Sequence, residues 1–165
     1  MVAVYVAGGS NVDAPRNVKR AAALLRQRFA DIRFSHAYQN APAGFDGADF
    51  INFVAGFTTS EPLADVVAAL QKIEAACGRA RLAPKWEPRS MDLDILLYGD
   101  EINLRGSPRL PRPDLLRRSY MLGPMAEIAP DVVHPTTRRS VGELWREFDA
   151  ASHPLTPIDL DLARD

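Results

Sequence analysis

The stretch FINFVAGFTTSEPLADVVAALQKIEAACG, residues 50–78, decides the fold class because it places a strand directly before the clearest helix of the chain. Phe50 to Thr59 is rich in aromatic and β-branched residues and predicts a strand. Ser60 is a good N-cap candidate, Pro62 falls in the first helical turn, and Gly78 is a typical C-terminal stop. Between these signals an apolar stripe recurs at helical spacing, formed by Leu63, Val66, Val67, Leu70, Ile73, Ala76 and Cys77. The stretch therefore predicts a strand followed by an amphipathic helix.

The chain before this stretch begins with the same order of elements. Residues 2–7 alternate valine with other residues and end at Gly8-Gly9-Ser10-Asn11, which predicts a first strand and its turn. Asp13 and Pro15 then open a helix. Its apolar face, spaced by three and four residues, is Val18, Ala21, Ala22, Leu25 and Phe29. We expect a second strand from Asp31 to Asn40 and a loop from Ala41 to Asp49, which contains a proline and two glycines.

The chain after residue 78 supplies one more clear strand and less regular structure. Arg79 to Ser90 is polar and basic with two prolines, which predicts a loop, whereas Met91 to Tyr98 predicts a strongly apolar strand. Beyond a turn at Gly99-Asp100 we expect a short strand at 102–104, an irregular segment at 106–113, helices at 115–127 and 141–148, and an irregular tail at 150–165. The order strand, helix, strand, strand, helix, strand predicts an α+β fold, a ferredoxin-like βαββαβ sandwich in which helices pack on an antiparallel sheet, as a single domain over residues 1–165.

The composition narrows the functional class. A net charge of −1, a pI near 6.3 and 25% charged residues describe an ordinary soluble protein and argue against a nucleic-acid partner. The single cysteine, Cys77, excludes an intrachain disulfide framework and a cysteine-rich zinc site, and it suits a reducing compartment. Met1 to Ala7 carries no cationic leader pattern, and no later apolar run approaches the roughly 20 residues that span a bilayer. We therefore expect a cytoplasmic monomer with small-molecule partners and no membrane partner.

Asp92 and Asp94 are the first candidates for chemistry. Residues two apart on a strand point to the same face, so both carboxylates face one side while Leu93 and Ile95 face the other. Such a pair can hold one or two magnesium ions, which take few protein ligands and bind phosphate oxygens besides. Paired acids on a strand are often only a solvated face. Acids embedded in an apolar strand, however, need a partner such as a metal or an arginine.

Basic residues flank this acidic pair on both sides in the sequence. The segment before it carries Arg79, Arg81, Lys85 and Arg89 against only Glu87. The segment after it carries Arg105, Arg109, Arg112, Arg117 and Arg118 against only Asp114. A nucleoside triphosphate with bound magnesium requires this combination, carboxylates for the metal and guanidinium groups for the phosphates. Scattered surface arginine is the alternative reading of the same pattern.

Several motifs in order resemble a known family. The run WEPRSMDLDI, residues 86–95, is similar to the W-x-P-R-x-x-D-L-D-I signature of 6-hydroxymethyl-7,8-dihydropterin pyrophosphokinases. The other matching blocks are Gly9-Ser10-Asn11, Asp49-Phe50-Ile51-Asn52, Glu74 with Gly78-Arg79-x-Arg81, Pro111-x-Pro113, Arg118, Tyr120 and residues 122–130. The match extends over residues 2–134. It implies a ferredoxin-like transferase of folate synthesis that moves pyrophosphate from ATP to the hydroxymethyl-dihydropterin and releases AMP.

The resemblance also implies a role for each matched residue. Asp92 and Asp94 would bind two Mg²⁺ ions, and with them Arg79 and Arg89 would be the catalytic residues. The pterin would contact Asn40, Ala41, Ala43, Phe50, Asn52, Trp86 and Tyr120, with its ring held between the two aromatic faces of Phe50 and Tyr120. ATP would contact Glu74, Arg79, Arg81, Trp86, Arg89, Ile95, Arg112 and Arg118. The loop 79–89 would be mobile and close over the substrates.

A stacked heterocycle and an amide that matches its polar edge make physical sense for these pterin contacts. Plain core aromatics remain the alternative for Phe50 and Tyr120. The histidines His36, His134 and His153 lie away from the matched catalytic blocks, so no general base is predicted.

Three positions depart from the family pattern. The family commonly has glycine at Glu87, often a basic residue at Leu82, and usually histidine at Arg112. These departures keep open a paralogue that acts on a modified pterin. Two non-catalytic ferredoxin-like classes are also possible: an RNA-binding module, which would need a basic aromatic motif on its central strands, and a regulatory domain, which would not need an aspartate pair beside arginines.

Overall fold

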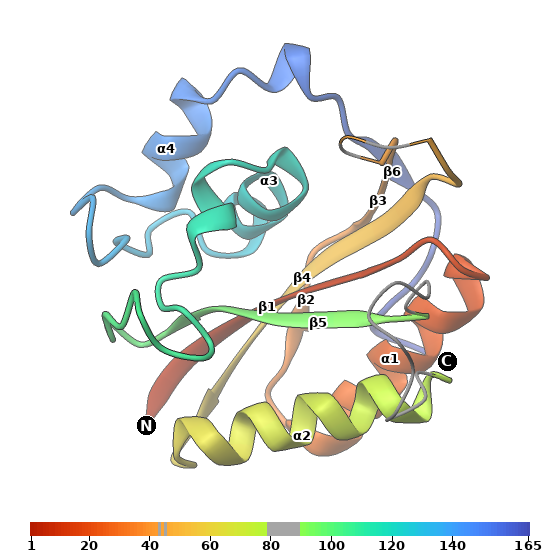
Figure 1. Cartoon of the computed structure of the whole chain (residues 1–165), viewed down its shortest axis with the longest axis horizontal. Coiled ribbons are helices and arrows are strands. Elements are labelled where there is room, and N and C mark those ends of the chain that lie inside the picture. The colour runs from red at the N-terminus through yellow and green to blue at the C-terminus, as the bar shows by residue number, and fades with distance from the viewer. Residues whose placement is uncertain (43, 45, 79–89) are drawn as a thin grey trace.

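An antiparallel sheet forms the centre of the computed structural model, which describes residues 1–42, 44, 46–78 and 90–165. Its strands are β1 (Val2–Ser10), β2 (Arg33–Phe34), β3 (Ala37–Asn40), β4 (Phe50–Thr59), β5 (Asp92–Tyr98) and β6 (Thr156–Ile158). They lie in the order β5-β1-β4-β3-β6, and β2 also pairs with β4. The helices are α1 (Ala14–Arg28), α2 (Leu63–Ala76), α3 (Ser119–Ile128) and α4 (Val141–Glu147), with short 3-10 turns η1 (Pro113–Leu116) and η2 (Ala150–Ser152). This arrangement confirms the predicted α+β, ferredoxin-like fold (Figure 1).

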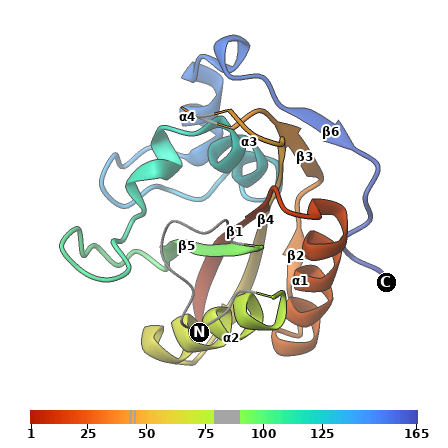
Figure 2. The same cartoon turned by 45° about the vertical axis from the view of Figure 1, so that its right-hand side comes forward.

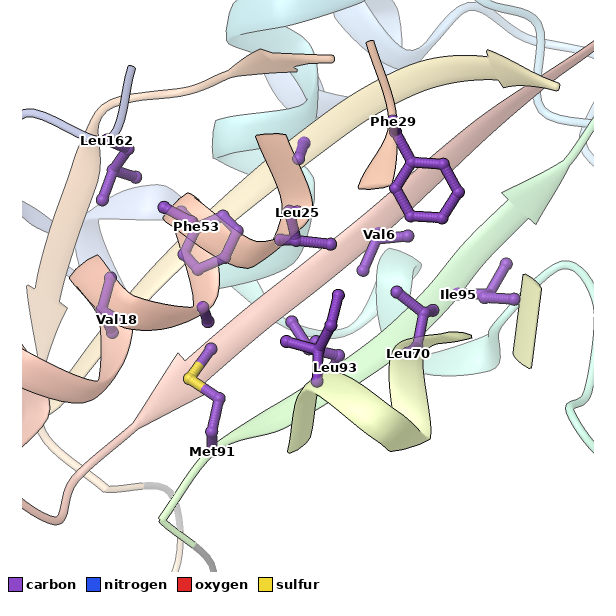
Figure 3. Packing of buried hydrophobic residues seen from close by; sticks show 14 of the residues in the cluster. Val6, Val18, Leu25, Phe29, Phe53, Leu70, Met91, Leu93, Ile95 and Leu162 are labelled. Atoms are coloured by element: carbon purple, nitrogen blue, oxygen red, sulfur yellow. The ribbon is translucent and has the colours of Figure 1, made fainter. Parts of the chain in front are cut away.

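The helices cover the two faces of the sheet in pairs. α1 and α2 lie on one face, and α3 and α4 lie on the other (Figures 1 and 2). Alternate residues of β1 are buried on opposite faces of the sheet. Val4 and Val6 belong to the cluster beneath α1 and α2, which Figure 3 shows. Tyr5 and Ala7 are buried against α3 and α4. In the described residues no helix is both long and apolar enough to cross a membrane.

The acidic strand β5 has the orientation that the sequence predicts. Leu93 and Ile95 are buried in the cluster with α1 and α2, so Asp92 and Asp94 face the layer of α3. The register between β1 and β5 shifts at Tyr5/Val6, opposite Leu96. Because of this irregularity, Leu96 and the following Leu97 are both buried on the α3 side.

Several boundaries differ from the prediction. The strand expected at 31–40 is broken into β2 and β3 because Ser35 pairs locally with Val54: its N–H donates to the Val54 carbonyl over 2.8 Å, and its Oγ accepts the Val54 N–H over 2.9 Å. The strand expected at 102–104 is only a single bridge between Asn103 and Leu110. The helix expected at 115–127 is divided into η1 and α3.

The start of α2 also corrects the prediction. Ser60 does not cap this helix; Pro62 occupies the N-cap position in an extended conformation, without a side-chain cap. The end agrees with the sequence, since Gly78 follows the helix with φ +96° and donates its N–H to Ala75 O over 3.1 Å.

The tail at 150–165 has little regular structure, as expected, but the short elements η2 and β6 and the contacts of the tail were not predicted. β6 pairs with the outer edge of β3, and Leu162 is 3% exposed in the cluster that contains Phe53 (Figure 3). Lys19 and Arg26 of α1 donate hydrogen bonds to the backbone carbonyls of Asp161 and Leu162. The tail therefore closes one edge of the sheet and completes the core beside α1.

We predict that Leu162→Ala lowers the free energy of unfolding by about 2–4 kcal/mol, because it removes a buried side chain and leaves a cavity. Chemical denaturation measures the change. Leu104→Ala is the matched control, since Leu104 is 52% exposed and its loss should cost no more than about 0.5 kcal/mol. Equal, small effects of both substitutions would mean that the tail contributes nothing to the core.

Candidate functional site

A cavity opens on the α3 side of the sheet, where the ends of β3, β4 and β5 meet η1 and the first turn of α3. The predicted site residues that line it together are Asn40, Phe50, Asn52, Asp92, Asp94, Arg112, Arg118 and Tyr120. They come from five elements or their flanking residues that are far apart in the sequence. The fold therefore assembles candidate metal, phosphate and ring contacts in one place.

A pair of amides forms the polar wall of the cavity. Asn52 is 6% exposed and donates from Nδ2 to Asn40 Oδ1 over 2.5 Å. Its neighbour on β1 is Gly9, where a Cβ atom would lie 2.3 Å from Asn52 Oδ1. Glycine at this position thus makes the room that the Asn52 amide needs above the sheet. This contact gives a structural reason for the glycine of the first motif, Gly9-Ser10-Asn11.

The acidic pair lies at the cavity end of β5. Asp94 forms an ion pair with Arg112, whose Nη1 is 3.5 Å from Asp94 Oδ1. The backbone N–H of Arg112 donates to Leu96 O over 2.9 Å, which fixes the start of η1 beside β5. Both carboxylates thus line a cavity, and Asp94 pairs there with a cation rather than lying on an open solvated surface.

The donor set fits a magnesium ion. Among the described residues, no group of three or more histidine, cysteine or carboxylate side chains is close enough to hold a metal by itself. Two same-face carboxylates at a cavity suit Mg²⁺, which commonly takes one or two carboxylates and completes its shell with water and phosphate oxygens. Asp92 and Asp94 are therefore the residues that could hold such an ion here.

Two aromatic residues line the same cavity from different elements. Phe50 is the first residue of β4, and Tyr120 lies in the first turn of α3. Burial, the largest cause, raises the pKa of the Tyr120 phenol, so its ring stays neutral at physiological pH. Both residues are half-buried and border the cavity, and Tyr120 also packs against the core cluster beneath α3.

Three predicted residues lie outside this cavity. Ala41 lines a neighbouring hollow that also contacts Arg118 and Tyr120. Ile95 is 3% exposed in the core against α1 and α2, so any contact with ATP has to come from its backbone. Glu74 is buried on α2, and its Oε2 accepts the N–H of Leu93 over 2.9 Å.

The role of Glu74 at β5 was not visible in the sequence. β5 is the outermost strand of the sheet, and an exposed edge leaves backbone groups unpaired. Glu74 satisfies one of them at Leu93, between the two aspartates. By strand alternation the N–H of Ile95 points to the same side as that of Leu93.

Some predictions fall outside the described residues. These are the roles of Ala43, Arg79, Arg81, Lys85, Trp86 and Arg89, the departures at Leu82 and Glu87, and the closure of the loop 79–89. The described chain resumes at Ser90, whose carbonyl accepts a hydrogen bond from Ser10 Oγ.

One charged residue of the cavity was missed as a site candidate. Asp114 lines the cavity, and its Oδ2 lies 3.5 Å from Arg112 Nη2. The sequence shows it only as the one acid in a basic segment. Its spacing of two residues from Arg112 was the available signal.

Two of the histidines, His134 and His36, have contacts away from the cavity, whereas His153 borders the neighbouring hollow with Ala41 and Tyr120. His134 is 1% exposed, and its Nδ1 accepts the N–H groups of Thr136 over 3.3 Å and Thr137 over 3.2 Å. Burial lowers the pKa of His134, which favours this neutral acceptor. His36 pairs through Nδ1 with Glu127 at 2.7 Å, away from the cavity.

We predict that Glu74→Ala lowers the free energy of unfolding by about 1–3 kcal/mol, because the Leu93 N–H loses its buried acceptor. Glu74→Gln keeps an acceptor oxygen and should lose less than half as much. Lys72→Ala, an exposed change on the same helix, is the control for chemical denaturation. A loss of ATP affinity in Glu74→Ala without any loss of stability would contradict the structural role.

Comparisons with known proteins point to one family. The model of the 7,8-dihydro-6-hydroxymethylpterin-pyrophosphokinase family matches residues 5–130. A 2-amino-4-hydroxy-6-hydroxymethyldihydropteridine pyrophosphokinase of Haemophilus influenzae is 33% identical over 163 residues, which cover 96% of this chain and 99% of that protein. The protein of the same name from Pseudomonas aeruginosa is 37% identical over 139 residues, 82% of this chain and 85% of the relative.

Solved structures agree on the fold. The crystal structure of wild-type Plasmodium falciparum HPPK-DHPS superposes with a TM-score of 0.65 at 12% identity, over 88% of this chain. This chain covers only 44% of that protein, so it spans less than half of its length. At this identity the likeness establishes the fold alone.

Proposed function

Because the chain belongs to the 7,8-dihydro-6-hydroxymethylpterin-pyrophosphokinase family, we propose that the cavity beside Asp92 and Asp94 is its active site. The protein transfers pyrophosphate from ATP to 6-hydroxymethyl-7,8-dihydropterin in folate biosynthesis, giving AMP and the pterin diphosphate. The observation that carries the site proposal is the meeting of both aspartates with Phe50 and Tyr120 around one cavity, inside the region that the family model matches.

Asp92 and Asp94 hold two Mg²⁺ ions in this proposal. Their carboxylates face the cavity together, and Mg²⁺ with few protein ligands leaves coordination sites for phosphate oxygens. When bound, the ions supply positive charge that binds the triphosphate and stabilises charge on the transferring group. The shared face of β5 supports this assignment.

The phosphates of ATP bind to the arginines. Arg112 and Arg118 border the cavity beside the aspartates, and their guanidinium groups suit phosphate oxygens. Arg79 and Arg89 act on the transferring phosphates, with further contacts from Arg81 and Trp86; these four assignments rest on the motif alone. Ile95 contributes its backbone to ATP binding, and Glu74 supports β5 behind it.

The pterin lies between Phe50 and Tyr120. A flat heterocycle stacks well on two aromatic faces, and the Asn52–Asn40 amide pair supplies donors and acceptors at its polar edge. Ala41 borders the adjoining hollow, and the contact assigned to Ala43 rests on the motif alone. In this proposal the ring lies beside the two carboxylates that hold the metal.

The reaction is an in-line attack of the pterin hydroxymethyl oxygen on the β-phosphorus of ATP, with AMP as leaving group. The residues of the cavity accelerate it by holding the two substrates in line and by placing positive charge where negative charge develops. None of the described histidines lines this cavity, His153 borders the adjoining hollow, and the proposal assigns no general base.

The remaining features of the protein complete the proposal. Residues 1–165 form one pyrophosphokinase domain, which the packing of Leu162 into the core beside α1 supports. The protein works as a monomer in the cytoplasm, and its one cysteine, buried at residue 77, suits that reducing compartment.

We predict that Asp94→Asn lowers AMP formation from ATP and 6-hydroxymethyl-7,8-dihydropterin by at least about 100-fold, because the metal loses a charged ligand. Asp100→Asn, an exposed acid in the turn after β5, is the matched control and should keep normal turnover. Thermal denaturation confirms that both variants fold. Near-normal activity of Asp94→Asn in magnesium would exclude the metal assignment, and wild-type protein that forms no AMP would exclude the reaction.

We also predict that Tyr120→Leu raises the KM for the pterin by about 5–30-fold, because stacking on an aromatic face contributes roughly 1–2 kcal/mol. Tyr120→Phe keeps the ring and should retain the wild-type KM within about twofold. Steady-state kinetics at saturating ATP separate the two variants. If Tyr120→Phe were as impaired as Tyr120→Leu, the hydroxyl rather than the stacked ring would carry the contact.

A further inference from the structure

Arg112 lies between two carboxylates of the cavity and is bound tightly by neither. Its Nη1 is 3.5 Å from Asp94 Oδ1, and its Nη2 is 3.5 Å from Asp114 Oδ2. Strong charge-assisted hydrogen bonds between such groups measure about 2.7–2.9 Å. The guanidinium is therefore shared between a candidate metal ligand and a second acid that has no assigned role.

A third nitrogen of the Arg112 guanidinium, Nε, indicates that the cavity takes a ligand. Arg112 Nε is buried and has no hydrogen-bond partner in the described part of the chain. A buried N–H without an acceptor is unfavourable, and native proteins rarely retain one without a reason. An oxygen-rich ligand in the cavity, such as a phosphate, would supply the missing acceptor.

The backbone on both sides of Arg112 is fixed, so only its side chain has to respond to a ligand. The Arg112 N–H donates to Leu96 O over 2.9 Å. The carbonyl of Asp114 accepts the N–H groups of Arg117 over 3.0 Å and Arg118 over 2.9 Å. The two carboxylates therefore stand at fixed places, one on each side of a guanidinium that can change partners.

We propose that Arg112 is a resident counter-cation of Asp94 which a divalent metal displaces, and that Asp114 is the positioning residue which keeps the displaced guanidinium in the cavity for phosphate oxygens. This inference rests on the proposed metal role of Asp94. A metal ion and a guanidinium repel each other at the same carboxylate, so the ion has to compete with Arg112 for Asp94. Asp114 then holds the guanidinium until phosphate binds.

The arrangement makes metal binding depend on the nucleotide. Without nucleotide, Arg112 opposes the metal at Asp94. With nucleotide, the phosphates accept both the metal and the guanidinium, so the same arginine favours the complex. The two ligands are thereby coupled through one side chain, and each strengthens the binding of the other.

The test measures Mn²⁺ binding to the whole protein without nucleotide, by the electron paramagnetic resonance of free Mn²⁺. Arg112→Met should bind Mn²⁺ at least about threefold more tightly than the wild type, because the competing charge is gone. Asp114→Asn should bind Mn²⁺ at least about twofold more weakly. Without the Asp114 charge, the guanidinium pairs with Asp94 alone and competes more strongly with the metal. Arg16→Met is the matched control: Arg16 pairs with Asp13 at the same 3.5 Å but is 79% exposed and does not line the cavity.

The same variants are then titrated with α,β-methylene-ATP in the presence of Mn²⁺. Arg112→Met should now bind the nucleotide at least about threefold more weakly, so its two effects have opposite signs. Arg112→Lys retains the positive charge but lacks the paired N–H donors of a guanidinium. It should keep the wild-type Mn²⁺ affinity and lose nucleotide affinity. This variant keeps the test decisive if Asp114→Asn fails to fold in thermal denaturation.

The outcomes separate this inference from the active-site proposal. If Asp94→Asn abolishes Mn²⁺ binding while Arg112→Met leaves it unchanged or weaker, Arg112 is not a counter-cation and the inference is wrong. If Asp114→Asn folds and binds Mn²⁺ like the wild type, Asp114 is not the positioning residue. If Asp94→Asn binds Mn²⁺ as well as the wild type, the metal assignment itself fails.

Discussion

The burial of Leu93 and Ile95 against α2 fixes the direction in which the carboxylates of Asp92 and Asp94 point. Those two apolar side chains are 6% and 3% exposed, and in a strand their burial turns the alternate residues to the opposite face. A register change of one residue would place the acids in the core and the leucine in the cavity. The chemistry of the site therefore depends on apolar packing on the far side of the sheet.

The edge position of β5 adds a second constraint. In the part of the chain that the structure describes, β5 has a neighbouring strand on one side only, yet it presents two carboxylates to the cavity. Two hydrogen bonds hold β5 in place. Glu74 of α2 accepts the N–H of Leu93, and the N–H of Arg112, just before η1, donates to the carbonyl of Leu96. The strand is thus held on its open side by single contacts from a helix and a 3-10 turn.

The sequence predicted the features that depend on local pattern. Helical spacing located α2, and alternation correctly assigned Leu93 and Asp94 to opposite faces, because both follow from backbone geometry alone. The break at Ser35 depends on its pairing with Val54, which no local pattern reveals. The short strand β6 within the tail was missed for the same reason, since its partner is more than a hundred residues away.

The sequence identified the site residues whose type also matches a motif. It did not identify residues whose role depends on contacts in three dimensions. Asn52, Phe50 and Tyr120 line one cavity as the motifs imply. The role of Asp114 depends on its distance to Arg112 in three dimensions, so its spacing alone did not identify it. For Ile95, by contrast, the apolar strand pattern already placed its side chain away from the acids.

The pairing of β6 with β3 has a consequence for biosynthesis. β3 ends at Asn40 in the cavity wall, and the strand that covers its outer edge follows more than 150 residues of chain. While the protein is being made, that edge keeps its backbone groups unpaired and open to other extended chains. The last contacts of the sheet are also among the most distant in sequence, which makes their formation slow. The outer edge of β3, beside the candidate cavity, is therefore covered only after residues 156–158 have been made.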